Sequence, residues 1–259
     1  MNPTVPQVAE LSAPSTWRTV DLISDLHLQP GEPQTFEAWQ RYLTRTTADA
    51  VFILGDLFEV WVGDDAASAG SFEARCAEVL RQAAARRALF FMHGNRDFLV
   101  GDAFMASSQT RLLADPTALA FAGQRWLLSH GDALCLDDVD YQRFRADVRG
   151  AAWQQAFLAK PLAERQAIAR QLRAHSEARK RSDAVYADAD TPLARQWLQA
   201  AGASTLIHGH THRPADHDLG DGLRRLVLSD WDTGATPPRA EVLRLTADGR
   251  VQRCSPDTC

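Results

Sequence analysis

The amino-acid sequence predicts a layered α/β fold, and two observations carry the prediction. Short apolar runs of four to six residues, rich in Val, Ile, Leu and Phe, recur along the chain and have the character of buried strands. The segments between several of these runs, such as 35–48 and 71–87, have a helical composition of Ala, Arg, Leu and Glu. Alternating strands and helices are typical of a layered α/β sheet. At 259 residues, the chain can form one large domain of this class, or one domain with an insertion.

Each apolar run ends in a polar cluster. In chain order, TVDLIS is followed by Asp25 and His27, AVFIL by Asp56, ALFFM by His93, Asn95, Arg96 and Asp97, WLLS by His130 and Asp132, STLI by the histidines of 206–218, and LVLS by Asp230. After a single strand, such a cluster is more often a turn or a helix cap than a ligand set. In open α/β sheets, however, ligand sites form beyond the carboxyl ends of the strands. Because five consecutive strand ends carry possible ligands, we expect them to share one site.

The stretch LIHGHTHRPADHD (206–218) contains four of the eight histidines in the chain. Three of them, His208, His210 and His212, occupy alternate positions, and alternate side chains of an extended segment point to the same side. At least two of these imidazoles could therefore converge on one point. A polar loop rich in histidine explains the stretch equally well unless other parts of the chain supply partners.

Taken together, the strand ends offer oxygen and imidazole donors and no thiolate. Such donors suit Mn, Fe or Zn better than a structural zinc site built on cysteines. Two ions about 3.5–4 Å apart can generate a hydroxide and hold a phosphoryl group during in-line displacement. Seven ligands are about right for two such ions if one carboxylate bridges them. The seven candidates are Asp25, His27, Asp56, Asn95, His130, His210 and His212.

The motifs SDLHL, GDLFE, GNRDF, SHGD and HGHTHRP, in this order across residues 18–214, resemble the calcineurin-like metallophosphoesterase superfamily. The resemblance implies a four-layer α/β/β/α sandwich, here with a helical insertion, and a centre of two divalent ions, expected to be Mn²⁺. It assigns one ion to Asp25, His27 and His212, and the other to Asn95, His130 and His210. Asp56 would bridge the two ions, and His208 would lie at a strand end without binding metal.

Longer motifs resemble one family of this superfamily, which cleaves the diphosphate of UDP-2,3-diacylglucosamine to UMP and 2,3-diacylglucosamine 1-phosphate in lipid A biosynthesis. These motifs are GDLFEVWVGDD (55–65), GNRDFLVG (94–101), HGDALCLDDVDYQRFR (130–145) and IHGHTHRPADH (207–217). The superfamily commonly has His where this chain has Arg96, and a guanidinium binds phosphate oxygens bidentately without losing its charge. The leaving group, a phosphate monoester with a second pKa of about 6, departs without a general acid.

The same resemblance implies catalytic roles for Asp56 and Arg96. It also implies substrate contacts, of which Ser176 and Lys180 fit a Ser-x-x-x-polar spacing in the helical insertion. The implied substrate-binding residues are Asn95, Arg96, Asp138, Tyr141, Ser176, Lys180 and His210.

Two alternative functions remain open. Another metallophosphoesterase, such as a dinucleoside polyphosphate hydrolase or a phosphodiesterase, would keep the metals without a lipid-sized cap. A non-catalytic scaffold would be expected to lose ligands.

Residues 139–200 contain no strand-like run and carry apolar residues at helical spacing, so we expect a helical cap there. The segment 139–183 has ten basic and five acidic residues, a charge of +5 within a chain of −5. A cap with an apolar inner side for acyl chains and a basic side for lipid headgroups fits this pattern, as does an ordinary solvated helical face. The run LFEVWVG (57–63) would form another apolar wall, unless it simply belongs to the core.

The amino-acid composition predicts the partners of the protein and its location in the cell. A net charge of −5 argues against nucleic acid as a partner. The four cysteines have no CxxC spacing, which argues against a disulfide framework and for a reducing compartment. Residues 1–16, with three prolines, fit a flexible tail rather than a signal peptide, and no stretch approaches 18 apolar residues. We therefore expect a phosphoesterase domain at 17–259, in a soluble cytoplasmic monomer that associates peripherally with the inner membrane.

Overall fold

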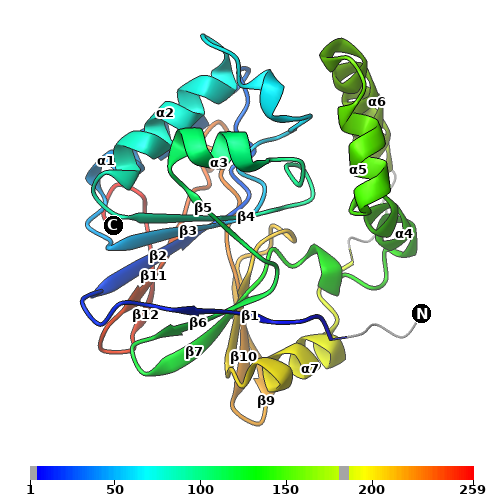
Figure 1. Ribbon diagram of the computed structural model, residues 1–259. Helices are drawn as coiled ribbons and strands as arrows, with labels where there is room; N and C mark the ends of the chain where they lie inside the picture. The colour runs from blue at the N-terminus through cyan, green and yellow to red at the C-terminus, as the bar shows by residue number, and fades with distance from the viewer. Residues whose placement is uncertain (1–4, 181–186) are drawn as a thin grey trace.

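The computed structural model describes the backbone of residues 5–180 and 187–259, with all side chains in these ranges except those of 173–180. The described residues form two six-stranded sheets surrounded by helices (Figure 1). In spatial order, the first sheet contains β12 (Val251–Cys254), β11 (Val242–Thr246), β2 (Thr19–Ile23), β3 (Ala50–Leu54), β4 (Ala88–Met92) and β5 (Arg111–Leu113). The second contains β1 (Ala9–Ser12), β6 (Thr117–Phe121), β7 (Gln124–Leu128), β8 (Thr205–His208), β10 (Leu223–Val227) and β9 (Ala215–Gly220).

The strands that precede the polar clusters are parallel neighbours. β2, β3 and β4 run parallel in the first sheet, and β7, β8 and β10 run parallel in the second. Their carboxyl ends therefore open toward one edge of each sheet. β3 shows why these segments are strands: all five residues of AVFIL are buried, with Phe52 facing the second sheet and Ile53 facing helices.

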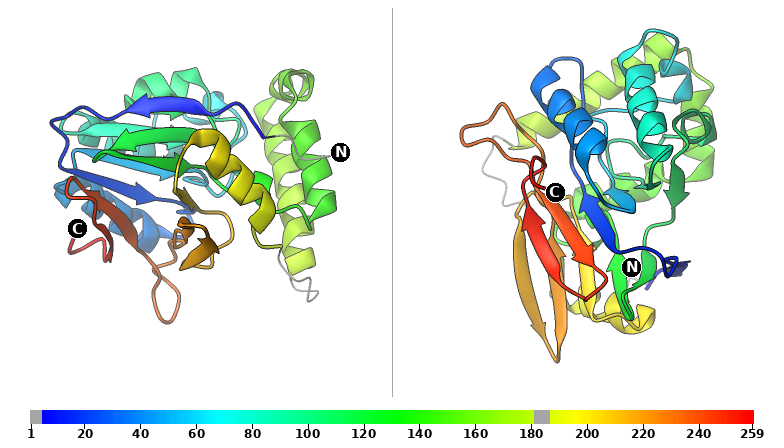
Figure 2. Two further views of the ribbon diagram at one scale, coloured as in Figure 1. Left: turned by 90° about the horizontal axis from the view of Figure 1, so that it is seen from below. Right: turned by 90° about the vertical axis from the view of Figure 1, so that its left-hand side faces the viewer.

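The molecule has four layers, as the sequence resemblance implies. One apolar core lies between the two sheets, with Phe52, Phe90 and Trp126 among its members. The helices α1 (Pro33–Arg45), α2 (Phe72–Ala84) and α3 (Asp102–Ser108) cover the outer face of the first sheet. α7 (Thr191–Ala201) covers the outer face of the second sheet (Figures 1 and 2). The order is helices, sheet, sheet, helix, so the predicted α/β/β/α sandwich is confirmed.

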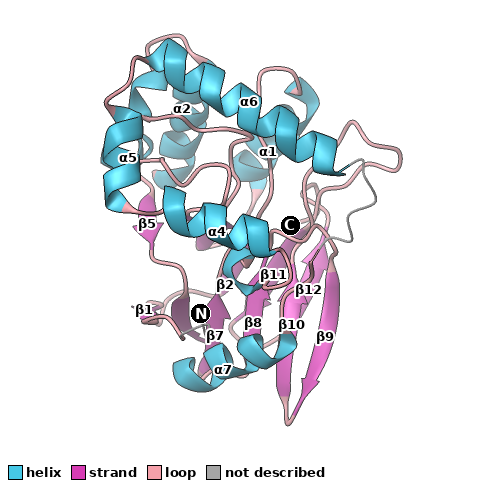
Figure 3. Cartoon of the chain, turned by 90° about the vertical axis from the view of Figure 1, so that its right-hand side faces the viewer, coloured by secondary structure: helices cyan, strands magenta, loops and turns pink. Residues whose placement is uncertain are grey.

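Three helices stand at one side of this sandwich (Figure 3). They are α4 (Val139–Val148), α5 (Ala151–Leu158) and α6 (Leu162–Lys180), and we call them the cap. Arg165 of α6 is buried, and its guanidinium contacts the carbonyl of Val62 and the carboxylate of Asp65. These contacts attach α6 to the loop after β3. α7, which the sequence interpretation included in the insertion 139–200, packs instead on the second sheet through Trp197 and Leu198.

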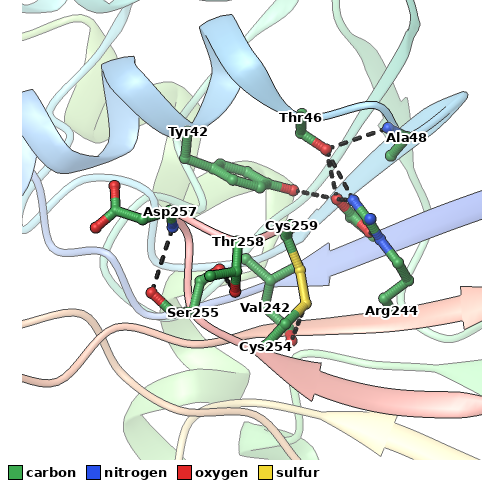
Figure 4. Close-up of a disulfide and its surroundings, with 11 residues drawn as sticks. Tyr42, Thr46, Ala48, Val242, Arg244, Cys254, Ser255, Asp257, Thr258 and Cys259 are labelled. Atoms are coloured by element: carbon green, nitrogen blue, oxygen red, sulfur yellow. Dashed lines mark hydrogen bonds and ion pairs between the residues drawn. A yellow bond between two sulfur atoms is a disulfide. The ribbon is translucent and has the colours of Figure 1, made fainter.

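The two ends of the chain differ from the expectations drawn from sequence. Residues Ala9–Ser12, within the expected flexible tail, form β1 and pair in parallel with β6. At the other end, Cys254 and Cys259 form a disulfide with a Cα–Cα distance of 6.0 Å (Figure 4). The expectation from cysteine spacing, which argued against disulfides, is wrong for this pair, because spacing alone does not reveal that the chain turns back after β12. Cys76 and Cys135 are free and buried.

A buried carboxylate joins three elements, and Figure 4 shows its partners Tyr42, Thr46 and Arg244 near the disulfide. Asp21 of β2 accepts hydrogen bonds from the hydroxyls of Tyr42 (2.9 Å) and Thr46 (2.8 Å) at the end of α1. Arg244 of β11 donates from Nε and Nη2 at 2.7 and 2.8 Å. The fully buried charge is thus paired and hydrogen-bonded, as burial of a carboxylate requires.

Among the described residues, no helix has the length and apolar character needed to cross a membrane.

Candidate metal centre

The predicted ligands lie on the loops that follow the parallel strands. Asp25 and His27 follow β2, and Asp56 follows β3. The remaining four follow other strands: Asn95 follows β4, His130 follows β7, and His210 and His212 follow β8. Backbone hydrogen bonds join these loops, for example from Asp25 N to Gly55 O (3.1 Å). Residues separated by up to 187 positions in the chain are therefore brought to one place by the two sheets.

The backbone is left-handed at most of these positions. Asp25, His27, Asp56, His210 and His212 have φ between 48° and 66°, and they are five of the eight non-glycine residues with positive φ in the described chain. This conformation is unfavourable for residues with a Cβ atom, and such strain concentrates at functional sites. The loops therefore adopt a costly conformation at the candidate ligands.

Two glycines in the motifs make room for the carboxylates. A Cβ atom at Gly94 would overlap the side chain of Asp56, and one at Gly209 would overlap Ser24 and Asp25. Only glycine permits so close an approach of the backbone. The Gly-Asn and Gly-His pairs of the motifs thus have a steric explanation.

The first donor group consists of Asp25, His27 and His212. His27 Nε2 lies 3.2 Å from His212 Nε2, and His212 Nε2 lies 3.4 Å from Asp25 Oδ1. All three offer an atom to one point within the described structure. Burial would raise the pKa of Asp25, but the nearby His212 and the other surrounding histidines lower it well below its usual range. Asp25 is therefore an anion.

The second donor group consists of Asn95, His130 and His210. Asn95 Oδ1 lies 3.0 Å from His130 Nε2 and 2.9 Å from His210 Nδ1. Burial lowers the pKa of His210 to about 3, so its ring is a neutral donor. Burial alone would also lower the pKa of His130, but the field of Asp56, Asp25 and Asp132 outweighs it and raises that pKa to about 9. The centre therefore has a field that favours cations.

Asp56 lies between the two groups. Its Oδ2 is 4.0 Å from His27 Nε2 in the first group and 3.8 Å from His130 Nε2 in the second. Asp56, Asp25 and His130 also form a second cluster able to hold an ion. His208, in contrast, has its Nδ1 2.8 Å from the Gly209 carbonyl and belongs to neither of the two clusters able to hold an ion in the described structure.

The donors fit a pair of metal ions. Asp25 Oδ1 is completely buried and has no hydrogen-bond partner, although it belongs to an ionised carboxylate. A buried charge of this kind is stabilised by pairing or by metal coordination. The oxygen and nitrogen donors, without sulfur, are those that Mn, Fe and Zn accept. Asp25, His27, Asp56, His130 and His212 therefore form a candidate site for two metal ions, and Asn95 and His210 lie beside it.

Arg96 lies at the rim of this site. Its side chain is 16% exposed, its Nη1 is 3.7 Å from Glu59 Oε1, and its backbone N donates to Asp56 Oδ1 at 2.8 Å. The arginine is thus held next to the centre and still reaches solvent. Of the other predicted substrate contacts, Tyr141 stacks on the ring of His210 with centroids 5.8 Å apart. Asp138 caps α4 by accepting a hydrogen bond from Tyr141 N (3.1 Å). The side chains of Ser176 and Lys180 lie outside the described residues.

Four carboxylates around the centre escaped the sequence interpretation as site residues. Asp97 is buried and accepts hydrogen bonds from Gly94 N at 2.8 Å and Phe58 N at 3.3 Å. Asp132 accepts from the hydroxyl of Tyr141 at 2.7 Å. The other two, Glu59 and Asp230, face the ring nitrogens of His27 and His212 that point away from the centre. For Asp97, Asp132 and Asp230, the position just after a strand was the available signal. Glu59 ends the GDLFE motif, but its place inside an apolar run gave no sign that it faces the centre.

Comparison with known proteins agrees with this geometry. Residues 18–214 match the model of the calcineurin-like phosphoesterase family. A relative from Chromobacterium violaceum, named UDP-2,3-diacylglucosamine hydrolase, is 50% identical over 224 residues, which cover 83% of this chain and 91% of the relative. Relatives of the same name from Xanthomonas oryzae pv. oryzae and Xanthomonas campestris pv. campestris are 43% and 44% identical, each over 89% of this chain and 96% of their own length. The chain belongs to the calcineurin-like phosphoesterase family.

Proposed function

We propose that this protein is a metal-dependent pyrophosphohydrolase that cleaves UDP-2,3-diacylglucosamine to UMP and 2,3-diacylglucosamine 1-phosphate, a step of lipid A biosynthesis. The observation that carries the proposal is the complete set of seven donors with Arg96 beside them. The names of relatives that are 43–50% identical over most of the chain support the same substrate. Because all seven donors are present and converge, a non-catalytic scaffold is disfavoured.

The side chains of the site have separate tasks in this reaction. Two divalent ions, which we expect to be Mn²⁺, would supply Lewis-acid activation and a hydroxide at neutral pH when bound to these residues. Asp56 would bridge the ions, and Asn95 and His210 would face both metal and substrate. Arg96 would bind the diphosphate with its planar fork and stabilise the charge that develops on it. The leaving phosphate needs no proton from the protein, which explains why an arginine can replace a histidine there.

The cap supports a substrate with acyl chains. A cavity of about 270 Å³ lies between α6 and the loop after β3, lined by Val60, Gln166, Ala169 and Arg170. Val60 is 40% exposed, whereas its neighbours in the run 57–63, such as Phe58 and Trp61, are buried in the core. Most of that run is therefore core packing, and Val60 is the part that can line an acyl site. Tyr141, Asp138, Ser176 and Lys180 complete the proposed substrate contacts.

Exposed apolar side chains on the cap, together with its positive charge, support contact with a membrane. Val139, Phe144, Leu158 and Leu172 are exposed on α4, α5 and α6. The segment 139–183 that contains them carries a net charge of +5, which favours anionic lipid headgroups. We propose peripheral association of a cytoplasmic monomer with the inner membrane. Sedimentation with anionic vesicles, and the mass of the protein in solution, test these two points.

Substrate comparison tests the proposed activity. UDP-N-acetylglucosamine has the same diphosphate but lacks the two long acyl chains. Buried methylenes contribute about 0.8 kcal/mol each, so losing them should make this compound a very poor substrate. The measurement is UMP release from the two compounds at matched concentrations, with detergent to disperse the lipid. Comparable kcat/KM values for the two compounds would contradict the proposed preference for acyl chains. The protein would then be assigned only to the phosphoesterases in general.

A further inference from the structure

The side chain of Glu59 connects a candidate metal ligand with the arginine at the rim. Glu59 Oε2 lies 2.8 Å from His27 Nδ1, within the distance of an ion pair. The other oxygen, Oε1, lies 3.7 Å from Arg96 Nη1. The carboxylate is only 12% exposed. One largely buried acidic group therefore faces both His27 and Arg96.

This contact distinguishes His27 from the other three candidate histidine ligands. His130 turns its Nδ1 to a neutral acceptor, the carbonyl of Leu54, at 2.9 Å. His212 has a carboxylate at 3.8 Å, beyond hydrogen-bond distance, and that carboxylate of Asp230 already accepts from Arg239. His210 directs Nδ1 itself toward Asn95 in the centre. Within the group of four, His27 alone has a carboxylate close behind the nitrogen that points away from the metal.

The backbone around Glu59 holds this carboxylate in place. Leu28 pairs with Phe58 in a parallel bridge, and Glu59 N donates to Leu28 O at 3.2 Å. On the other side, Trp61 N donates to Arg96 O at 3.1 Å. Phe58 and Trp61, on either side of Glu59, are buried. The segment 57–61 is therefore fixed between the loop of His27 and the loop of Arg96, and the position of Glu59 is preorganised.

We propose that Glu59 is a positioning residue that fixes the ring of His27, with Nε2 toward the first metal ion and Nδ1 as donor to the carboxylate. The proposal rests on the two-metal function proposed above. A carboxylate behind a ligating imidazole sets its tautomer and orientation and makes it a stronger donor, and removing such a partner costs about 10–100-fold in metal affinity. The metal held by Asp25, His27 and His212 should therefore depend on Glu59, whereas the metal held by Asn95, His130 and His210 should not.

Titration of the metal-free protein with Mn²⁺, followed by calorimetry and by the electron paramagnetic resonance signal of bound Mn²⁺, tests this proposal. Glu59→Gln should weaken one of the two sites by about 10–100-fold and leave the other unchanged. Glu59→Asp keeps the charge on a shorter side chain and should recover part of the affinity. Glu37→Gln, an exposed glutamate on α1, is the matched control and should bind Mn²⁺ as the wild type does.

A double-variant cycle shows through which residue Glu59 acts. In a His27→Ala background, Glu59→Gln should cause no further loss of Mn²⁺ affinity. If Glu59→Gln leaves both affinities unchanged and only lowers turnover, as expected for loss of an Arg96 anchor, the proposal is overturned. It is also overturned if the effects of the two substitutions simply add. A wild-type protein that fails to bind two Mn²⁺ ions would instead contradict the proposed function.

Discussion

Tyr141 donates a hydrogen bond of 2.7 Å from its hydroxyl to Asp132, which lies two residues after the candidate ligand His130 in the loop that follows β7. Arg145 donates to the same carboxylate oxygen at 2.8 Å, and Arg149 lies 3.6 Å from it. Arg149 also donates to the carbonyl of Gly94 at 2.8 Å. The first cap helix is therefore attached directly to the loops that carry the metal ligands.

Removing the charge of Asp132 should loosen this attachment. Burial would raise the pKa of Asp132, but Arg145, His130 and Arg149 lower it far below its usual range, so the group is ionised. Hydrogen bonds to charged groups contribute about 1.5–3 kcal/mol each, and Asp132→Asn should lower the free energy of unfolding by at least that amount. Limited proteolysis should cleave α4–α6 faster than in wild type. Asp140→Asn, on the exposed side of α4, should behave as wild type. Equal cleavage rates for all three proteins would contradict the anchoring role.

Asp56→Ala tests the bridging position. Because Asp56 Oδ2 lies near both donor groups, its loss should reduce the content of both metals and nearly abolish hydrolysis. Elemental analysis of the purified variant gives the metal content, and circular dichroism checks that it is folded. Two full equivalents of metal in the folded variant would show that Asp56 does not bridge.

Arg96→Ala should leave both metals bound, because no nitrogen of its side chain belongs to either donor group. The loss of a preorganised charge near the diphosphate should reduce turnover by about 10²–10³-fold. Arg96→Lys should restore only part of it, since an ammonium group lacks the bidentate fork. Metal analysis and turnover on the diphosphate substrate are the two measurements. Wild-type turnover in the alanine variant would make Arg96 a structural residue.

Asp188 provides a pH-dependent contribution to stability outside the centre. Its hydrogen bonds with buried Arg225 (2.7 and 3.0 Å) lower its pKa to about 2, below the value near 3.9 of an unfolded chain. Since the folded state binds the proton more weakly, the contribution is present above about pH 4 and is lost as the pH falls to about 2. The side chain is 43% exposed, so solvent screening keeps the contribution modest.

Urea unfolding at a series of pH values measures this contribution. Asp188→Asn should lower the midpoint at pH 7 and match the wild type near pH 2. Asp221→Asn is the control, because Asp221 forms an ion pair with Arg195 but is 82% exposed. A constant difference between Asp188→Asn and wild type across this pH range would refute the linkage.

The sequence predicted the strands that carry the site because each is a buried apolar run and its ligands follow directly in the chain. AVFIL and ALFFM, for example, are almost entirely buried in the structure. β1 was not predicted, because AELS alternates between half-buried and exposed residues on an edge strand and has no apolar run. α7 has the same helical composition as the cap, so only its packing on the second sheet separates it from that cap.

The contribution of Glu59 could not be predicted from local pattern. Its orientation depends on the parallel bridge between Leu28 and Phe58, a contact between segments 30 positions apart. In the sequence it is a single acidic residue among apolar neighbours. The same reason applies to Arg165, whose burial depends on how α6 lies against the loop after β3.

The left-handed backbone at five of the seven candidate ligands bears on protein engineering. A designer who transplants only these side chains to another scaffold, in ordinary right-handed or extended loops, would aim them in different directions. Each left-handed residue other than glycine costs roughly 1–2 kcal/mol, so the recipient scaffold must be stable enough to tolerate several of them. The transferable unit is the set of strand-end loops with their two close-approach glycines, rather than the list of metal-binding amino acids.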